Sequence, residues 1–213
     1  MSEQLTGKYI VIEGTDGAGK SIQHKYLIDY LAKFSQRVVG VAEPGGTDIG
    51  LLLRDIIKNP FFNKTPETEF DLLTAARREL ARLVLTPEIV NGSIVISDRN
   101  WFSSVAYQGF GRRMDVNEII ETSKRAMGKF FMPDESVILD VPVSIVELRK
   151  SFRAEKPDTF EIEENPFFER VRQGYLWVAD KFDIEVIDGS PTIELVHQNI
   201  LRQLGYTALE NQA

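Results

Sequence analysis

The octapeptide Gly14-Thr15-Asp16-Gly17-Ala18-Gly19-Lys20-Ser21 constrains this chain more than any other segment. It fits the pattern G-x-x-x-x-G-K-[S/T] and lies between an apolar run, residues 9–12, and a stretch with helical spacing of its apolar residues. Glycines in such a loop let backbone N–H groups surround an anion, and the helix start behind them adds partial positive charge. Lys20 supplies a charge for β- and γ-phosphates, and Ser21 offers a hydroxyl to Mg²⁺. All eight residues are therefore predicted to bind the phosphates of ATP.

Short β-branched runs alternate along the chain with longer segments of helical spacing. Strands are predicted over residues 9–12, 38–41, 94–96, 137–139 and 184–187. Helices are predicted over residues 21–34, 47–57, 65–90, 101–108, 115–127, 143–153, 166–181 and 192–204. Continuous apolar runs are typical of strands covered on both faces, and βαβα alternation indicates right-handed crossovers. The sequence therefore predicts an α/β fold with helices on both faces of a parallel sheet.

Composition excludes several classes of protein. The 213 residues are 43% hydrophobic and 27% charged, which is typical of a globular chain and excludes a disordered or fibrous one. The absence of cysteine excludes disulfides, a thiolate nucleophile and a zinc–thiolate site. A net charge of −7 disfavours a nucleic-acid polymer as partner, and no apolar stretch approaches the ~20 residues of a membrane span. Because the N-terminus also lacks the pattern of a secretory signal, we expect a cytoplasmic protein.

A second pair of polar residues, Asp98 and Arg99, comes just after the strand predicted over residues 94–96. Carboxyl ends of parallel strands meet at the same edge of a sheet, so this pair is expected to face the phosphate-binding loop. Asp98 is then placed to hold Mg²⁺ or its water ligands, and Arg99 to bind a second phosphate with two parallel hydrogen bonds. Asp-Arg pairs are more often surface ion pairs, but the position after a buried strand favours the crevice.

Several further motifs carry a resemblance to a known family. Ser97-Asp98-Arg99 followed by Ser103-Ser104-Val105-Ala106-Tyr107-Gln108-Gly109 resembles the D-R-x-x-x-S-S-x-A-Y-Q-G signature of bacterial thymidylate kinases. The other segments similar to that family are Glu43-Pro44-Gly45-Gly46-Thr47, Leu72-Leu73-Thr74-Ala75-Ala76-Arg77-Arg78-Glu79 and Asp188-Gly189-Ser190-Pro191. The matches run in the expected order from Tyr9 to about Pro191, and their combination is specific.

The resemblance implies a three-layer P-loop NTPase fold, with a five-stranded parallel sheet in the order 2-3-1-4-5 and a small lid. It implies one P-loop kinase domain over residues 1–213, with the lid at about residues 149–165. The implied activity is transfer of the ATP γ-phosphoryl group to dTMP, giving dTDP, with Mg²⁺ as the cofactor. Members of the family commonly form homodimers through helices that flank the base-binding region.

The resemblance also implies which residues bind dTMP. They are Asp16, Glu43, Pro44, Arg54, Phe70, Leu73, Arg77, Arg99, Ser104, Tyr107 and Gln108. Arg77 and Gln108 would bind the thymine edge, with Ser104 nearby. Tyr107 would crowd the 2′ position and favour deoxyribose, and Asp16 would hold the 3′ hydroxyl. The alternatives are a solvated helix face for Arg77 and core packing for Tyr107.

On the phosphate side, the resemblance implies that Arg54 and Arg99 reach the acceptor phosphate. Arg149, Ser190 and Pro191 would lie on the adenine side of ATP. The residues expected to take part in catalysis are Asp16, Lys20, Arg99 and Arg153. Ser21 and Asp98 are expected to hold the metal.

Outside the lid, the sequence departs from the family pattern at three places. The arginine before E-P-G-G-T is Ala42, and the residue after Asp-Arg, usually Tyr or His, is Asn100. The aromatic residue that commonly stacks on thymine is Leu73, and Phe70 lies on the same helix face as a substitute.

A basic segment follows the fourth predicted strand. Phosphoryl transfer gathers negative charge on the moving group, and the variable positions of the phosphate-binding loop hold no arginine. A closing lid is the expected donor of the missing cation, with Arg153 at the transition state and Arg149 at the adenine face or the phosphates. The family lid often reads D-R-x-E, whereas this chain has Asp158-Thr159-Phe160-Glu161, so the assignment within the lid stays open.

Three alternatives remain at the level of the sequence. The first is another kinase of the same fold, acting on dUMP, dGMP or a nucleoside. The second is a nucleotide-binding switch, although the guanine-reading N-K-x-D motif is missing: Asn63-Lys64-Thr65-Pro66 lacks the Asp. The third is a degenerate homologue that binds ATP without transferring phosphate.

Overall fold

The computed structural model describes residues 7–34, 37–151, 159–160 and 163–207. Within them the chain forms a five-stranded sheet in the order β2-β3-β1-β4-β5, in which every neighbouring pair is parallel. The strands are β1 (Lys8–Gly14), β2 (Val38–Ala42), β3 (Ile94–Asp98), β4 (Glu135–Asp140) and β5 (Glu185–Asp188). The predicted sheet and its strand order are confirmed.

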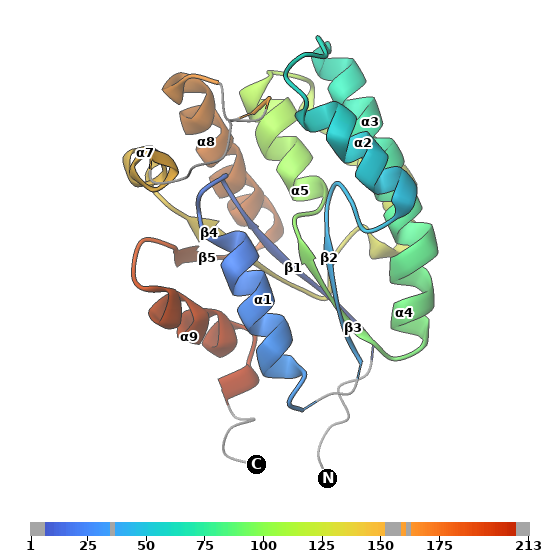
Figure 1. Cartoon of the computed structure of the whole chain (residues 1–213), viewed down its shortest axis with the longest axis vertical. Helices are drawn as coiled ribbons and strands as arrows, with labels where there is room; N and C mark the ends of the chain where they lie inside the picture. Colours follow the sequence, from blue (N-terminus) through green and yellow to red (C-terminus); the bar gives the residue numbers. More distant parts are fainter. Residues whose placement is uncertain (1–6, 35–36, 152–158, 161–162, 208–213) are drawn as a thin grey trace.

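Helices follow the strands in the predicted alternation (Figure 1). They are α1 (Lys20–Leu31), α2 (Asp48–Lys58), α3 (Pro66–Leu80), α4 (Thr86–Val90), α5 (Trp101–Ser104), α6 (Val116–Met127), α7 (Val143–Ser151), α8 (Asn165–Phe182) and α9 (Ile193–Gln203). The helix predicted over residues 65–90 is interrupted by a π-helical segment, Ala81–Leu85. Pro87 has no N–H for the regular ladder, and the Thr86 hydroxyl donates to the carbonyl oxygen of Ala81 at 2.7 Å.

Alternate side chains of β1 enter two hydrophobic cores, one on each face of the sheet. Tyr9 and Val11 pack in the core that α3, α5, α6 and α8 cover. Ile10 and Ile12 pack in the core that α1 and α9 cover. A strand with both faces buried needs apolar residues at successive positions, which explains its continuous apolar run. Within the described residues, no helix combines the length and apolar character needed to cross a membrane.

The register of the sheet brings the polar strand ends together. Ile12 of β1 pairs with Asp98 of β3, and Ala42 of β2 pairs with the same residue on the other side. Gly14, where the phosphate-binding loop begins, pairs with Leu139 of β4. The functional segments expected from the sequence therefore leave the sheet at one edge.

Candidate active site

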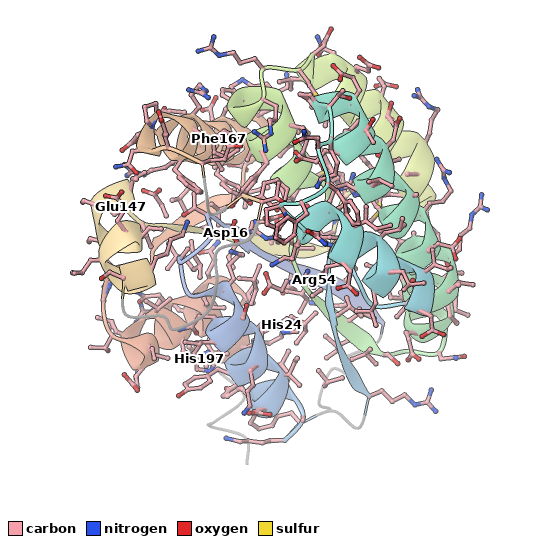
Figure 2. All side chains as sticks on the ribbon, turned by 45° about the horizontal axis from the view of Figure 1, so that its top comes forward. Asp16, His24, Arg54, Glu147, Phe167 and His197 are labelled. Carbon is pink, nitrogen blue, oxygen red and sulfur yellow. The ribbon has the colours of Figure 1, made fainter. Side chains whose placement is uncertain are left out.

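A cavity of about 360 Å³ opens at the carboxyl edge of the sheet. It is lined by residues from the β1–α1 loop, the end of β2, α2, α3, the end of β3, and the helix that follows β3, which consists of α5 and the π-helical segment Val105–Gly111. The lining residues that the sequence singled out are Asp16, Gly17, Gly19, Lys20, Ser21, Glu43, Pro44, Arg54, Leu73, Arg77, Asp98, Arg99, Ser104, Tyr107 and Gln108. Asp16 lies in the β1–α1 loop and Arg54 in α2, and both residues, labelled near the middle of Figure 2, line this one cavity. The two expected phosphate sites therefore share one space.

The phosphate-binding loop has the backbone geometry that its glycines allow. Gly14 has φ 143°, and a Cβ there would lie 2.5 Å from the carbonyl oxygen of Leu139. Gly19, with φ 97°, caps the start of α1 in the left-handed conformation. The buried Lys20 ammonium donates to the carbonyl oxygen of Thr15 at 2.9 Å. Burial first, and then the nearby charge of Arg99, lowers the pKa of Lys20 to about 8.

Ser21 and Asp98 meet beneath the loop. The Ser21 hydroxyl donates to Asp98 Oδ2 at 2.7 Å, whereas Asp98 Oδ1 is buried with no hydrogen-bond partner among the described residues. A hydroxyl and a carboxylate with one oxygen to spare fit Mg²⁺, which prefers oxygen ligands and completes its shell with phosphate and water. No cluster of three or more His, Cys, Asp or Glu side chains suited to a metal occurs in the described part of the chain. A metal ion at this place would therefore have these two residues as its expected protein ligands.

Arg99 is held by a dense set of contacts in a left-handed backbone conformation, φ 79°. Its Nη1 donates to the Tyr175 hydroxyl at 2.6 Å, the Ser103 hydroxyl at 2.9 Å and the Gly14 carbonyl oxygen at 3.1 Å. Its Nη2 donates to Asp16 Oδ1 at 2.7 Å. A non-glycine residue at positive φ is strained, and this network over-determines its position. The guanidinium is thereby fixed at the cavity wall.

Asp16 joins Arg99 to the predicted sugar-binding tyrosine. The Tyr107 hydroxyl donates to Asp16 Oδ2 at 2.7 Å and accepts from the Asp16 backbone N–H at 3.0 Å. Burial acts to raise the pKa of the Asp16 carboxyl, but the charges of Arg99 and Lys20 outweigh it and hold that pKa well below its usual range. Asp16 is therefore an ionised acceptor beside a phenol ring that lines the cavity. Core packing alone does not describe Tyr107, because this side chain is buried and also lines the cavity.

Arg77 is buried rather than solvated, so the alternative of a solvated helix face is wrong for it. Its Nε donates to Glu43 Oε1 at 2.6 Å, and Nη2 lies 2.5 Å from the same oxygen. Nη2 also donates to the Ser104 hydroxyl at 2.8 Å, and Nη1 donates to the Ser123 hydroxyl at 3.3 Å. The neighbouring Arg78 is exposed. These contacts orient the Arg77 guanidinium at the cavity.

The predicted base-binding residues of α3 divide between cavity and core. Leu73 lines the cavity. Phe70, the expected substitute for the stacking aromatic ring, is buried in the core that α3 shares with α5 and α8. Gln108 lines the cavity and donates through Nε2 to Glu69 Oε1 at 2.8 Å. A stacking role for Phe70 stays a prediction.

Arg149 ties the phosphate-binding loop to the loop after β5. Its Nη2 donates to the carbonyl oxygens of Gly189 at 2.8 Å and Ser190 at 3.2 Å, and its Nη1 donates to that of Gly17 at 3.3 Å. Pro191 follows in the same loop. The predicted adenine-side residues therefore lie beside the predicted triphosphate site.

Of the predicted lid, residues 149–165, the structure describes residues 149–151, 159–160 and 163–165. The Thr159 backbone N–H donates to the carbonyl oxygen of Lys58, the last residue of α2, at 3.0 Å. The Phe160 ring lines the cavity and meets the Tyr107 ring edge to face, with centroids 5.4 Å apart. Arg153, the predicted transition-state cation, lies outside the described residues.

Sequence reasoning missed the residues that support the site. Glu13, fully buried, accepts from the Ser103 hydroxyl at 2.7 Å and the Tyr175 hydroxyl at 3.0 Å behind Arg99. The sequence signal that could have identified Glu13 is a carboxylate directly after the apolar residues of β1, where a charged side chain is rarely buried without partners. Phe160 carried no signal, because its contact with Tyr107 joins segments that are far apart in the sequence.

Comparisons with known proteins agree with this geometry. A family model described as thymidylate kinase matches residues 12–200. The thymidylate kinase of Dichelobacter nodosus is 37% identical over 200 residues, which are 94% of this chain and 98% of that protein. That of Legionella pneumophila is 40% identical over 199 residues, 92% of this chain and 93% of that protein. The crystal structure of thymidylate kinase from Ehrlichia chaffeensis matches with a TM-score of 0.73 and 27% identity, covering 92% of this chain and 98% of that one.

Proposed function

Because the chain belongs to the thymidylate kinase family, we propose that it transfers the γ-phosphoryl group of ATP to dTMP and releases dTDP and ADP. The observation that carries this proposal is the single cavity, which Lys20 lines from the phosphate-binding loop and Arg99 from the end of β3. Two phosphate-binding groups in one space suit direct transfer between two nucleotides.

The reaction needs one bond to form and one to break. An anionic oxygen of the acceptor phosphate attacks the γ-phosphorus of ATP, and the bond from that phosphorus to the β–γ bridging oxygen breaks in line. The electron pair leaves with ADP. No general base is required, because the attacking oxygen already carries negative charge. Catalysis then consists of positioning and charge neutralisation, and no covalent enzyme intermediate is expected.

The chain's cations divide these tasks between them. Lys20 binds the oxygens of the β- and γ-phosphates, and the backbone amides of its loop surround them. Arg99 and Arg54 bind the acceptor phosphate; Arg54 lines the cavity and donates to the carbonyl oxygen of Pro44 at 2.9 Å. Arg153 in the lid supplies the remaining charge at the transferring group, and Arg149 lies at the adenine side.

Ser21 and Asp98 would hold Mg²⁺, since the unpaired Asp98 Oδ1 leaves an oxygen for it in the described structure. When bound, the ion would supply positive charge that neutralises part of the charge of the phosphates. Omitting divalent cation and adding EDTA should abolish turnover, and undiminished turnover would contradict this assignment.

The nucleoside part of dTMP would occupy the cavity between α3 and the helix after β3. Arg77 and Gln108 bind the edge of the thymine ring, and Leu73 contacts its face. Tyr107 lies where a 2′ hydroxyl would stand, and Asp16 accepts from the 3′ hydroxyl. A site with fixed polar partners of this kind rejects ligands that leave those partners unpaired.

A homodimer is the expected assembly. Ile49, Leu52 and Ile56 form an exposed apolar row on one face of α2, next to the cavity wall that Arg54 lines. Light scattering at assay concentration tests this, and a species of 24.2 kDa, the mass of one chain, would contradict it. The expected cytoplasmic location and the single domain over residues 1–213 stay predictions.

A coupled assay for ADP release, with ATP and a panel of acceptors, tests the proposed function. We expect turnover with dTMP, weaker turnover with dUMP, and none with thymidine, which lacks the acceptor phosphate. Preference for another monophosphate or for a nucleoside would support another kinase of the same fold. If the protein binds ATP but releases no ADP in the presence of any of these acceptors, it is a homologue that has lost phosphoryl transfer.

The pKa of Lys20 predicts how activity depends on pH. Burial disfavours the ammonium and lowers its pKa to about 8, so the free enzyme loses this charge as pH rises through that value. Because kcat/KM reports ionisations of the free enzyme, kcat/KM for ATP should fall about tenfold per pH unit above pH 8. A pH–rate profile from pH 6.5 to 9.5 measures this, and a flat profile on a protein that stays folded would contradict it.

A further inference from the structure

Glu69, a residue of α3, is buried behind the predicted base site with 2% of its surface exposed. Its Oε1 accepts from Gln108 Nε2 at 2.8 Å, and its Oε2 lies 3.4 Å from Arg112 Nη2. A carboxylate paired with a guanidinium accepts hydrogen bonds and donates none. Glu69 therefore requires that the Gln108 amide turn its NH₂ group toward α3.

This requirement decides which atom of Gln108 remains for a ligand. An amide has one NH₂ side and one carbonyl side, and Glu69 occupies the first. The carbonyl Oε1 is buried and has no hydrogen-bond partner among the residues that the structure describes, although Gln108 lines the cavity. An unpaired buried acceptor costs free energy until a donor reaches it. The ligand that satisfies it must bring an N–H group to this point.

Arg77 supplies the opposite polarity on the same cavity. A guanidinium has five N–H groups and no acceptor. Those of Arg77 contact Glu43, Ser104 and Ser123, and the side chain lines the cavity together with Gln108. A ligand edge that meets both side chains therefore needs a carbonyl oxygen for Arg77 beside an N–H group for Gln108. The 4-carbonyl and N3–H of a 2,4-dioxopyrimidine meet this need, whereas cytosine has an amino group and a bare ring nitrogen at those positions.

Arg112 keeps the carboxylate of Glu69 in place. It forms an ion pair with Glu163, just before α8, as well as with Glu69. Its guanidinium lies 4.9 Å from the centroid of the Phe167 ring, which is labelled in Figure 2. The acceptor that orients Gln108 is thus held from a second direction.

We propose that Glu69 is a positioning residue that selects nucleotides with a 2,4-dioxopyrimidine base against cytosine nucleotides, by fixing the Gln108 carbonyl toward the ring N3–H. The proposal rests on the proposed function, since it concerns the acceptor of that reaction. Glu69 does not touch the ligand; it acts through the orientation of one amide.

The test compares kcat/KM for dTMP and for dCMP in the wild-type protein, in Glu69→Met and in Glu69→Gln. Methionine keeps the volume but removes the acceptor, so the Gln108 amide is released and the dTMP/dCMP ratio should fall about tenfold or more. Glutamine retains an acceptor oxygen beside Arg112, so its ratio should lie closer to that of the wild type. Glu67→Met is the matched control, because Glu67 is exposed in the first turn of the same helix. This control should leave the ratio unchanged.

A double-mutant cycle with Gln108→Met separates the proposed role from general loosening of the site. In that background the amide is gone, so Glu69→Met should change the ratio no further. Wild-type turnover of dTMP tests the proposed function separately, and its absence would overturn that function. An unchanged ratio in folded Glu69→Met, or an equal fall in the presence and absence of Gln108, would overturn the role of Glu69. If Glu69→Met does not fold, the Glu69→Gln protein decides, since a ratio below that of Gln108→Met would contradict the proposal.

Discussion

Replacement of Lys20 by alanine is expected to lower kcat about 10²–10³-fold while the protein stays folded. We propose that the Lys20 ammonium is the cation of the loop that binds the β- and γ-phosphates, where charge develops during transfer. Among the described residues its ammonium donates one hydrogen bond, to the Thr15 carbonyl oxygen, so we expect the fold to lose little stability with it. A coupled ADP assay gives kcat, and thermal unfolding followed by circular dichroism checks the fold.

Lys25 offers the matched control for this prediction. It lies on the exposed side of the same helix, so Lys25→Ala should change neither kcat nor the melting temperature appreciably. Lys20→Ala protein that keeps near-normal kcat would show that the loop does not bind the transferring phosphate in the way proposed.

Replacement of Arg77 by methionine is expected to cost about 3–5 kcal/mol of the free energy of unfolding. Arg77 and Glu43 are an ion pair with side chains 1% and 2% exposed, and Nη2 lies 2.5 Å from Oε1. Without Arg77 the Glu43 carboxylate is a buried charge with no compensating cation. Urea denaturation at fixed pH measures the loss. The exposed neighbour gives the control, since Arg78→Met should change the same quantity by less than about 0.5 kcal/mol.

The pH dependence of this loss has a definite sign. Burial raises the pKa of the Glu43 carboxyl, and the charge of Arg77 opposes that rise. In Arg77→Met the opposing charge is gone, so the pKa of Glu43 in the folded state rises further above its value in the unfolded state. Between these two pKa values the folded state keeps a proton on Glu43 that the unfolded state has released. Stability of the variant should therefore fall further as pH rises above the unfolded pKa of the carboxyl. The double variant Arg77→Met/Glu43→Gln should recover part of the loss, and a double variant no more stable than the single one would contradict this explanation.

The sequence alone predicted the parallel sheet and the position of the phosphate-binding loop. Residues 9–12 and 94–96 are continuous apolar runs, and both strands are buried on two faces, so local composition reflects the final environment. The octapeptide 14–21 was predictable from a local pattern because that pattern specifies the conformation of its own backbone, with Gly14, Gly17 and Gly19 at positive φ. Motifs shared with the family identified three further site residues, Arg77, Tyr107 and Gln108. The structure adds that all three line one cavity.

Other features depend on contacts that no local pattern specifies. Glu69 and Gln108 are 39 residues apart, and Glu13 and Tyr175 are 162 residues apart. Each pair forms only when the helices have packed on the sheet. The π-helical segment Ala81–Leu85 also escaped prediction, because the apolar spacing of an α-helix continues through it and only Pro87 interrupts the ladder.

The hydrogen bonds of Arg149 limit how it can meet a nucleotide. Its two terminal nitrogens already donate to four backbone oxygens, those of Gly17, Ala18, Gly189 and Ser190. Backbone oxygens cannot rotate away as the side-chain partners of Arg99 can, so little of the Arg149 guanidinium rim is left for the oxygens of a polyanion. What it can still offer is its flat π surface, on which a planar heterocycle stacks. Of the two roles expected for Arg149, we therefore propose support of the purine ring.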